Sequence, residues 1–325
     1  MTIESAAVPA VSVLMTVFEE QGGHLQASID SVLAQSFANF EFVIVDDGSR
    51  AKETLEVLER AASKDNRIRL IREGHNGLIA ALNVGLSHCR GEFVCRQDSD
   101  DWSEPGRIER QVEFLRRTPH VAIVGSYVRQ CQRNGDELGV FKPPTAPADV
   151  RSFCSVQSPF AHGAVCFRKS AIDAIGGYRK QLYCVEDWDC FWRLIDTFGG
   201  ANIPEVLYNY RFTGRSVSAR KWKEQAIGSR VLRILAERRD AGEPENVEQA
   251  VADVSEQFER SEAGYFGALR EADHKVLAGD GLAGLMAIVR AVGMRPYGAL
   301  GWLKLVRALT FIAVPPLRRR LFSFR

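Results

Sequence analysis

The first hundred residues alternate short apolar runs with segments of helical spacing, and this order constrains the fold more than any other feature. The apolar runs cover residues 11–17, 41–45, 68–71 and 92–97, and the helical segments between them cover 25–35, 54–62 and 78–88. The first run, VSVLMTV, is typical of a strand buried on both faces. Strands that alternate with helices form right-handed βαβ units around a parallel sheet. The sequence therefore predicts an α/β fold.

Beyond residue 119 the alternation is looser. We expect strands over 121–128 and 164–168, a loop at 141–144 and a helix over 187–197. From about residue 219 the sequence predicts mostly helix, with breaks at Glu243-Pro244 and at Pro296.

Composition and charge place the chain among folded globular proteins. Its 325 residues are 46% hydrophobic and 26% charged, enough for one large or two ordinary domains. The net charge of +1 gives no overall field that would attract nucleic acid. Seven cysteines, an odd number without a CxxC pair, indicate reduced thiols in the cytoplasm rather than disulfides or a zinc site. The amino-terminal residues lack a basic region, so no signal peptide is expected.

Two acidic groups follow predicted strands: Asp46-Asp47, and Asp98, Asp100 and Asp101. Ligands of parallel sheets bind beyond the carboxyl ends of the strands, so we expect both groups on one edge of the sheet. Aspartates one residue apart can place two oxygens near a hard cation such as Mg²⁺ or Mn²⁺. A cation held by few carboxylates and open to a diphosphate is suited to the expulsion of a nucleotide.

A purely structural interpretation of the second group is also available. Ser99 or Asp100 would cap a helix over 104–117, and Glu104 would lie in its first turn. This interpretation accounts for one or two of the acids, but not for three of them, nor for Asp46-Asp47. A dinucleotide site is disfavoured because GHNGLIAALNVG, residues 74–85, contains no GxGxxG fingerprint.

An ordered set of motifs resembles the inverting family 2 glycosyltransferases of the GT-A fold over about residues 9–218. The motifs are SVLMTVFEE, SIDSVLAQSF, VIVDDGS, NGLIAALNVGL, GEFVCRQDSDDWSEPGRIERQVEFL, HGAVCFRKSAIDAIGGY, VEDWDCFWRL and YRFTGRSVS. The resemblance implies a Rossmann-like, mostly parallel sheet in a GT-A catalytic domain over residues 1–218. Its nucleotide-sugar-binding half would cover about 9–118 and its acceptor-side half about 119–218. Residues 219–325 would form a helical carboxyl-terminal region.

The resemblance also implies roles for individual residues on the donor side. The residues expected to bind the nucleotide sugar are Thr16, Phe18, Glu19, Asp46, Asp47, Asn76, Gly77, Asp98 and Asp100. Within this set Asp46 and Asp47 would bind the base and ribose. Asp100 would be the direct ligand of Mn²⁺ or Mg²⁺, with Asp98 turned to the sugar or ribose, and Asp101 would support the following helix.

The catalytic base is expected in the segment VEDW. Inversion in one step needs a carboxylate that takes the proton of the acceptor hydroxyl. Asp187 is the expected base and Glu186 the alternative, although first-turn acids are favourable in any helix. His162 could contact the acceptor or the diphosphate, or be structural.

The sequence departs from the family pattern near the end of the resemblance. Many relatives carry a histidine where Phe212 and Thr213 stand, so the third protein contact to the metal stays open. Arg211 or Arg215 could compensate as a cation for the diphosphate. The absence of QxxRW favours the transfer of a single sugar over processive synthesis.

The carboxyl-terminal region combines apolar and basic residues. Residues 298–316 are apolar but include Lys304 and Arg307, and Arg318-Arg319-Arg320 follow. A membrane span needs about 20 apolar residues with few charges, which argues against one here. The pattern predicts either a basic amphipathic helix at a membrane interface or a helix packed on the body of the protein.

Together these features predict an inverting, metal-dependent enzyme that moves one sugar from a nucleotide-diphosphate sugar, expected to be UDP-linked. The acceptor would be a glycan or a lipid-linked glycan of cell-surface polysaccharide synthesis, reached at the cytoplasmic face of the membrane. A nucleotidyltransferase is one alternative, but VFEEQGGHLQAS lacks the basic residue that holds a triphosphate. A catalytically degenerate scaffold is another. The helical carboxyl-terminal region could also pair subunits.

Overall fold

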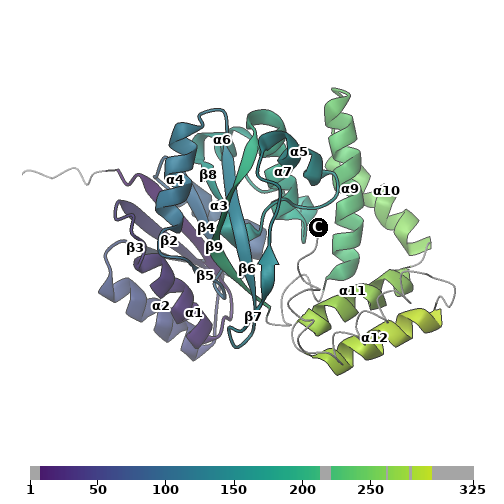
Figure 1. Cartoon of the computed structure of the whole chain (residues 1–325), viewed down its shortest axis with the longest axis horizontal. Helices are drawn as coiled ribbons and strands as arrows, with labels where there is room; N and C mark the ends of the chain where they lie inside the picture. Colours follow the sequence, from purple (N-terminus) through teal and green to yellow (C-terminus); the bar gives the residue numbers. More distant parts are fainter. Residues whose placement is uncertain (1–7, 213–220, 261–262, 278–279, 295–325) are drawn as a thin grey trace, which may run out of the picture. The chain divides into compact units, whose positions relative to one another are not determined.

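The structure, a computed structural model, describes residues 8–212, 221–260, 263–277 and 280–294 (Figure 1). The chain divides into two compact units. Unit 1 comprises residues 1–128, 142–180 and 187–210, and unit 2 comprises residues 129–141, 181–186 and 211–325. The predicted domain boundary at 218, Thr213, Arg215 and residues 298–322 lie outside the described residues, so these expectations stay predictions.

A nine-stranded sheet runs in the order β3-β2-β1-β4-β8-β6-β9-β5, with β7 paired to β6 (Figure 1). The strands are β1 Val11–Val17, β2 Phe40–Asp46, β3 Ile68–Arg72, β4 Phe93–Gln97, β5 Trp102–Ser103, β6 Ile123–Gln132, β7 Glu137–Phe141, β8 Cys166–Arg168 and β9 Gly200–Phe212. The first four are parallel to one another, whereas β8 runs antiparallel to β4 and β6. The predicted βαβ order and parallel sheet are confirmed.

The helices alternate with the parallel strands and then dominate the second half of the chain. They are α1 Gly22–Leu33, α2 Lys52–Lys64, α3 Leu78–His88, α4 Arg107–Arg117, α5 Pro147–Cys154, α6 Lys169–Ala174, α7 Glu186–Phe198, α9 Trp222–Asp240, α10 Val247–Arg260, α11 Ala263–Leu277 and α12 Gly281–Met294, with short 3₁₀ turns η1 His162–Ala164 and η2 Lys180–Leu182. None of the described helices is long and apolar enough to cross a membrane.

The core explains the apolar run with which the sheet begins. Every residue of β1 is buried. Val13 and Met15 pack in a cluster with Leu25 and Ile29 of α1, whereas Leu14 faces α3 on the other side of the sheet. A central strand covered on both faces has no solvent side, so it shows no polar alternation.

Three strands, β5, β7 and β9, were not predicted from the sequence. The longest, β9, contains Pro204 and two asparagines, residue types that are depleted in strands. The loop expected at 141–144 was predicted to start one residue too early, because Phe141 is still the last residue of β7.

The helix expected over 104–117 starts later than predicted. Residues 102–103 form β5 against β9, and α4 begins at Arg107 after Gly106, which makes no side-chain cap bond. The prediction that Ser99 or Asp100 caps this helix is therefore wrong. Asp101 is buried and lies six residues before Arg107, and its expected support of this helix stays a prediction. Trp102 and Ser103 form a strand paired with β9, and the helix begins only after this strand.

One glycine beside the central strand gives a test of this packing. A Cβ on Gly91 would lie 2.5 Å from the backbone of Val11 and Ser12. Gly91→Ala should therefore lower the free energy of unfolding by about 1–3 kcal/mol, measured by urea denaturation. Gly23→Ala is the matched control, because its Cβ meets no atom within 4 Å, and it should be neutral or stabilising by up to about 1 kcal/mol. Equal unfolding midpoints for the two variants would contradict this account.

Candidate functional site

The carboxyl ends of three adjacent parallel strands meet at one edge of the sheet, here called the rim. In the register of the sheet, Val17 pairs with Asp46, and Met15 pairs with Gln97. The residues that follow β1, β2 and β4 are therefore neighbours. The two acidic groups share one edge, as predicted.

Asp47 locks two loops of the rim together. Its side chain is almost fully buried, and its two oxygens accept hydrogen bonds from the backbone N–H groups of Asn76 at 2.8 Å and Gly77 at 3.0 Å. The Nδ1 atom of His75 lies 3.0 Å from the same carboxylate. Gly48 has a φ of 79°, and a Cβ there would stand 2.8 Å from the backbone nitrogen of His75. The loops after β2 and β3 therefore fit only with this aspartate and this glycine.

Asp46 holds its own turn. Its Oδ1 atom accepts the Ser49 N–H at 3.0 Å, and its carbonyl accepts the Glu73 N–H at 2.9 Å. The side chain therefore has one backbone hydrogen bond, where that of Asp47 has two. The two aspartates predicted to bind base and ribose therefore differ. The Asp47 side chain holds two loops together through two backbone hydrogen bonds, whereas the Asp46 side chain accepts only one.

The residues after β1 contribute an aromatic surface and a loop clamp. Phe18 is 47% exposed and stacks on His75, with ring centroids 4.0 Å apart and planes 17° apart. An exposed flat ring beside the loop at 76–77 can stack on a nucleobase. The carboxylate of Glu19 accepts the N–H groups of Arg50 at 2.7 Å and Ala51 at 3.0 Å. Glu19 therefore positions the start of α2.

Arg96 is a buried cation beneath the rim, and it was not predicted. Its Nη2 atom donates to Oδ1 of Asp98 at 2.8 Å and lies 3.4 Å from Oγ1 of Thr16. Its Nη1 atom donates to the carbonyls of Leu14 and Gln97. The side chain is 2% exposed, and a charge at that depth is costly unless an opposite charge compensates it. An arginine inside the apolar strand FVCRQ was the available signal, because a charged residue in a buried strand needs a partner.

A second buried layer fixes Asp98 from behind. The hydroxyl of Tyr208 accepts the Asp98 N–H at 3.1 Å, and the guanidinium of Arg107 lies 5.0 Å from the centre of the Tyr208 ring. Arg107 also donates to Oε1 of Gln97 at 3.0 Å. A Cβ on Gly163 would come within 1.9 Å of the Tyr208 hydroxyl and 2.7 Å of Oδ2 of Asp98. Only glycine leaves room for this approach.

Asp187, the second residue of α7, is half-buried, and its carboxylate accepts the N–H of Trp188 at 2.7 Å. Burial, the largest cause, and the charge of Asp98 together raise the pKa of Asp187 to about 6, although the hydrogen bond from the Trp188 N–H and the charge of Arg96 lower it. These three side chains are therefore near enough to interact electrostatically. A carboxyl group with a raised pKa beside other charges is typical of a general base.

His162 lies near the same charges but is neutral at physiological pH. Burial, followed by the charge of Arg96, lowers the pKa of His162 to about 3. Its Nε2 atom is 3.0 Å from the hydroxyl of Tyr178. His162 can therefore form hydrogen bonds, but it does not supply a positive charge to a diphosphate.

Two predicted site residues belong to unit 2. Glu186 is buried near Cys184. Burial of the Cys184 thiol, and second to it the charge of Glu186, raise the pKa of Cys184 to about 12. Arg211 donates to the carbonyl of Arg133 at 2.8 Å. Their roles as alternative base and diphosphate cation stay predictions.

The rim offers oxygen donors to a divalent cation. Asp98 gives one oxygen to Arg96, its Oδ2 atom faces Gly163, and Asp100 is half-buried two residues on. Within the described ranges no three His, Cys, Asp or Glu side chains are grouped as a metal site by themselves. A small set of carboxylates suits Mg²⁺ or Mn²⁺, which take their remaining ligands from water and phosphate.

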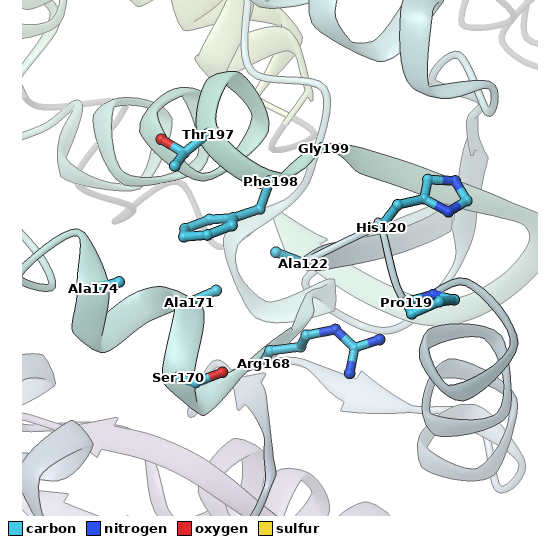
Figure 2. Close-up of a pocket in the computed structure, with 10 residues that line it drawn as sticks. All are labelled: Pro119, His120, Ala122, Arg168, Ser170, Ala171, Ala174, Thr197, Phe198 and Gly199. Atoms are coloured by element: carbon cyan, nitrogen blue, oxygen red, sulfur yellow. The ribbon is translucent and has the colours of Figure 1, made fainter.

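A separate pocket of about 610 Å³ lies at the other end of β4 (Figure 2). Arg168, which lines it, pairs in the sheet with Phe93, the first residue of that strand. The Arg168 guanidinium donates to the carbonyls of Leu115 at 2.6 Å and Val121 at 3.1 Å. This cation is therefore bound to the end of α4, and the pocket is distinct from the rim.

The division between Asp46 and Asp47 can be tested by two matched substitutions. Asp47→Asn leaves one side-chain oxygen where two backbone N–H groups need acceptors, so we expect a loss of about 1–3 kcal/mol in unfolding free energy. Asp46→Asn keeps an oxygen for Ser49 and should cost less than about 1 kcal/mol. Urea denaturation measures both. The assignment fails if Asp46→Asn is the more destabilising of the two.

Comparison with known proteins shows the family to which the chain belongs. Residues 12–175 match the family model described as glycosyl transferase family 2. The putative glycosyltransferase EpsE of Bacillus subtilis (strain 168) is 36% identical over 209 residues, which cover 62% of this chain and 73% of that protein. The UDP-Gal:alpha-D-GlcNAc-diphosphoundecaprenol beta-1,3-galactosyltransferase of Escherichia coli is 30% identical over 221 residues, which cover 67% of this chain and 80% of that protein.

Among solved structures, the mannosyltransferase PcManGT from Pyrobaculum calidifontis, in complex with GDP-Man and Mn²⁺, superposes with a TM-score of 0.55. The two are 18% identical, and the match covers 96% of this chain and 83% of that one. At this identity the likeness shows the fold alone, and it confirms the predicted GT-A architecture. The chain is therefore an enzyme that belongs to glycosyl transferase family 2.

Proposed function

We propose that the protein is an inverting, metal-dependent glycosyltransferase that moves one sugar from a nucleotide-diphosphate sugar to a glycan or lipid-linked acceptor. The observation that carries this proposal is the set of three interacting charges at the rim. Asp187 has a pKa of about 6, and the charges of both Asp98 and Arg96 act on it. This arrangement provides a base beside a site that can receive a diphosphate.

Asp187 is the proposed base of a single displacement. Its carboxylate takes the proton of the acceptor hydroxyl while that oxygen attacks the anomeric carbon from the side opposite the diphosphate. The bond between this carbon and the diphosphate oxygen breaks, and the electron pair leaves with the nucleoside diphosphate. A pKa of about 6 keeps the carboxylate ionised at pH 7 and above, yet more basic than an ordinary aspartate.

The donor nucleotide would bind along the loops after β1, β2 and β3. Phe18 stacked on His75 offers a flat surface for the base, and the backbone of Asn76 and Gly77 is held in place by Asp47. Asp46 would accept a hydrogen bond from the base. UDP is the proposed nucleotide, since the Escherichia coli relative bears UDP-Gal in its name.

Asp100, with Oδ2 of Asp98, would hold Mn²⁺ or Mg²⁺ at the rim. A divalent cation there would offset the charge that develops on the departing diphosphate. Arg96 keeps Oδ1 of Asp98 in place at 2.8 Å, so this residue has one oxygen fixed and the other turned toward Gly163. The fixed charge of Arg96 would also favour an anionic donor.

The acceptor is proposed to be a glycan on a lipid carrier in cell-surface polysaccharide synthesis. The Escherichia coli relative is named for a diphosphoundecaprenol-linked acceptor. The basic, apolar sequence over residues 298–322 would bring the enzyme to the cytoplasmic face of the membrane as a peripheral protein.

A screen of nucleotide sugars tests the proposal without knowledge of the acceptor. With Mn²⁺ present, the enzyme should hydrolyse one donor slowly to a nucleoside diphosphate and a free sugar. Asp100→Ala should lose at least about a hundredfold of this rate, because a positioned metal supplies several kcal/mol of charge stabilisation. Calorimetry with UDP and Mn²⁺ measures binding in parallel. Binding of neither donor nor nucleotide would overturn the proposal in favour of a scaffold, and release of pyrophosphate from a nucleoside triphosphate would point to a nucleotidyltransferase.

Removal of the base should separate binding from turnover. Asp187→Asn should bind the donor as the wild type does and lose about a thousandfold or more in kcat, since general base catalysis contributes about 10²–10⁴. The wild-type kcat should fall tenfold per pH unit below about pH 6, where the Asp187 carboxyl becomes protonated and cannot accept a proton. The residual activity of Asp187→Asn should lack this acid limb. Full turnover in the variant would show that another group, such as Glu186, is the base.

A further inference from the structure

Helices α11 and α12 of unit 2 lie side by side as a hairpin (Figure 1). Ala291 of α12 packs against Ala268 and Leu269 of α11, and Ile288 of α12 packs near Ala272. An ion pair between Glu271 and Arg290 links the two helices. One face of α12 is therefore packed against α11.

The outer face of α12 is apolar and exposed. Leu282, Met286 and Val289 are 71%, 67% and 55% exposed, and their spacing places them on one side of the helix. They make up three of the eight large hydrophobic side chains that are exposed in the described part of the chain. Single exposed apolar residues are ordinary, but a row of three on one helix marks a contact surface. We refer to these three residues as the α12 stripe.

The stretch of sequence that begins with α12 and runs to residue 325 carries charges of only one sign. Asp280 is the last acidic residue of the chain, and residues 281–325 contain eight basic residues: Arg290, Arg295, Lys304, Arg307, Arg318, Arg319, Arg320 and Arg325. Because the whole chain carries a net charge of +1, residues 1–280 carry −7. Basic and apolar residues without acids favour an anionic lipid surface, which attracts the cations and accepts the apolar side chains.

We propose that the α12 stripe inserts into the surface of an anionic phospholipid bilayer, to which the net positive charge of the sequence over 281–325 attracts the chain. A second copy of the chain is a poorer partner, because two acid-free basic segments would be brought together and repel each other. The proposal concerns where the enzyme is held, and it stands whichever donor the rim accepts.

Vesicle sedimentation of the full chain tests this proposal without donor or acceptor. The wild type should bind phosphatidylcholine vesicles that contain phosphatidylglycerol, bind pure phosphatidylcholine vesicles much less, and be released by high salt, which screens the charges. Met286→Glu should bind the anionic vesicles about tenfold more weakly, whereas Met286→Leu should bind as the wild type does. Val156→Glu is the matched control, because Val156 is an equally exposed apolar residue of unit 1, 64% exposed, and it should leave binding unchanged.

Thermal unfolding and sedimentation velocity of the same variants distinguish the other possible occupants of the α12 stripe. Unchanged vesicle binding by Met286→Glu together with a lower melting temperature would show that the chain's own residues 298–316 cover the stripe. A dimeric wild type that Met286→Glu converts to a monomer would show that a second copy covers it. Equal, salt-independent binding to neutral and anionic vesicles would refute the role of the basic residues. Each of these results overturns the proposal.

Discussion

The ion pair between the buried Arg96 and the partly exposed Asp98 is the interaction on which the architecture of the rim depends. An arginine that is 2% exposed at the end of a central strand is tolerable only if its charge is balanced where it lies. Asp98 supplies that balance at 2.8 Å, and Tyr208 fixes the backbone of Asp98 from behind. Asp98 thus offsets the free-energy cost of burying the Arg96 charge. Its own position is fixed in turn by Arg96 and Tyr208.

The charges of this pair also contribute to the pKa values of two nearby titratable groups, Asp187 and His162. Asp98 raises the pKa values of both Asp187 and His162, and Arg96 lowers both. Burial is the largest cause for both, and it favours the neutral form of each, so the Asp187 pKa rises while the His162 pKa falls. A base near neutrality and an uncharged histidine are therefore consequences of one buried environment.

Sequence periodicity was sufficient for the parallel half of the fold and insufficient for the rest. The strands β1, β2 and β4 were found because buried strands between helices leave apolar runs, and β3, although only its first residue is buried, was found between two helical segments. The strand β9 was missed because its Pro204 and asparagines are uncommon in strands, and the helix start at Arg107 was misplaced because β5 pairs with β9 across a long separation in sequence. Arg96 and its partner could not be inferred from spacing, since their contact depends on the depth of the site.

The acidic residues of the motifs consequently fall into two groups with different physical roles. The carboxylates of Asp47 and Glu19 accept backbone N–H groups of neighbouring loops, so their charge holds the walls of the rim in a fixed shape. Asp98 and Asp187 interact with each other across the site, and their charges are only partly compensated by Arg96. A rim built in this way is rigid where it forms its loops and electrostatically unbalanced at its centre. Such an excess of negative charge would favour a cation, and a bound cation would in turn compensate the charge of an anionic donor.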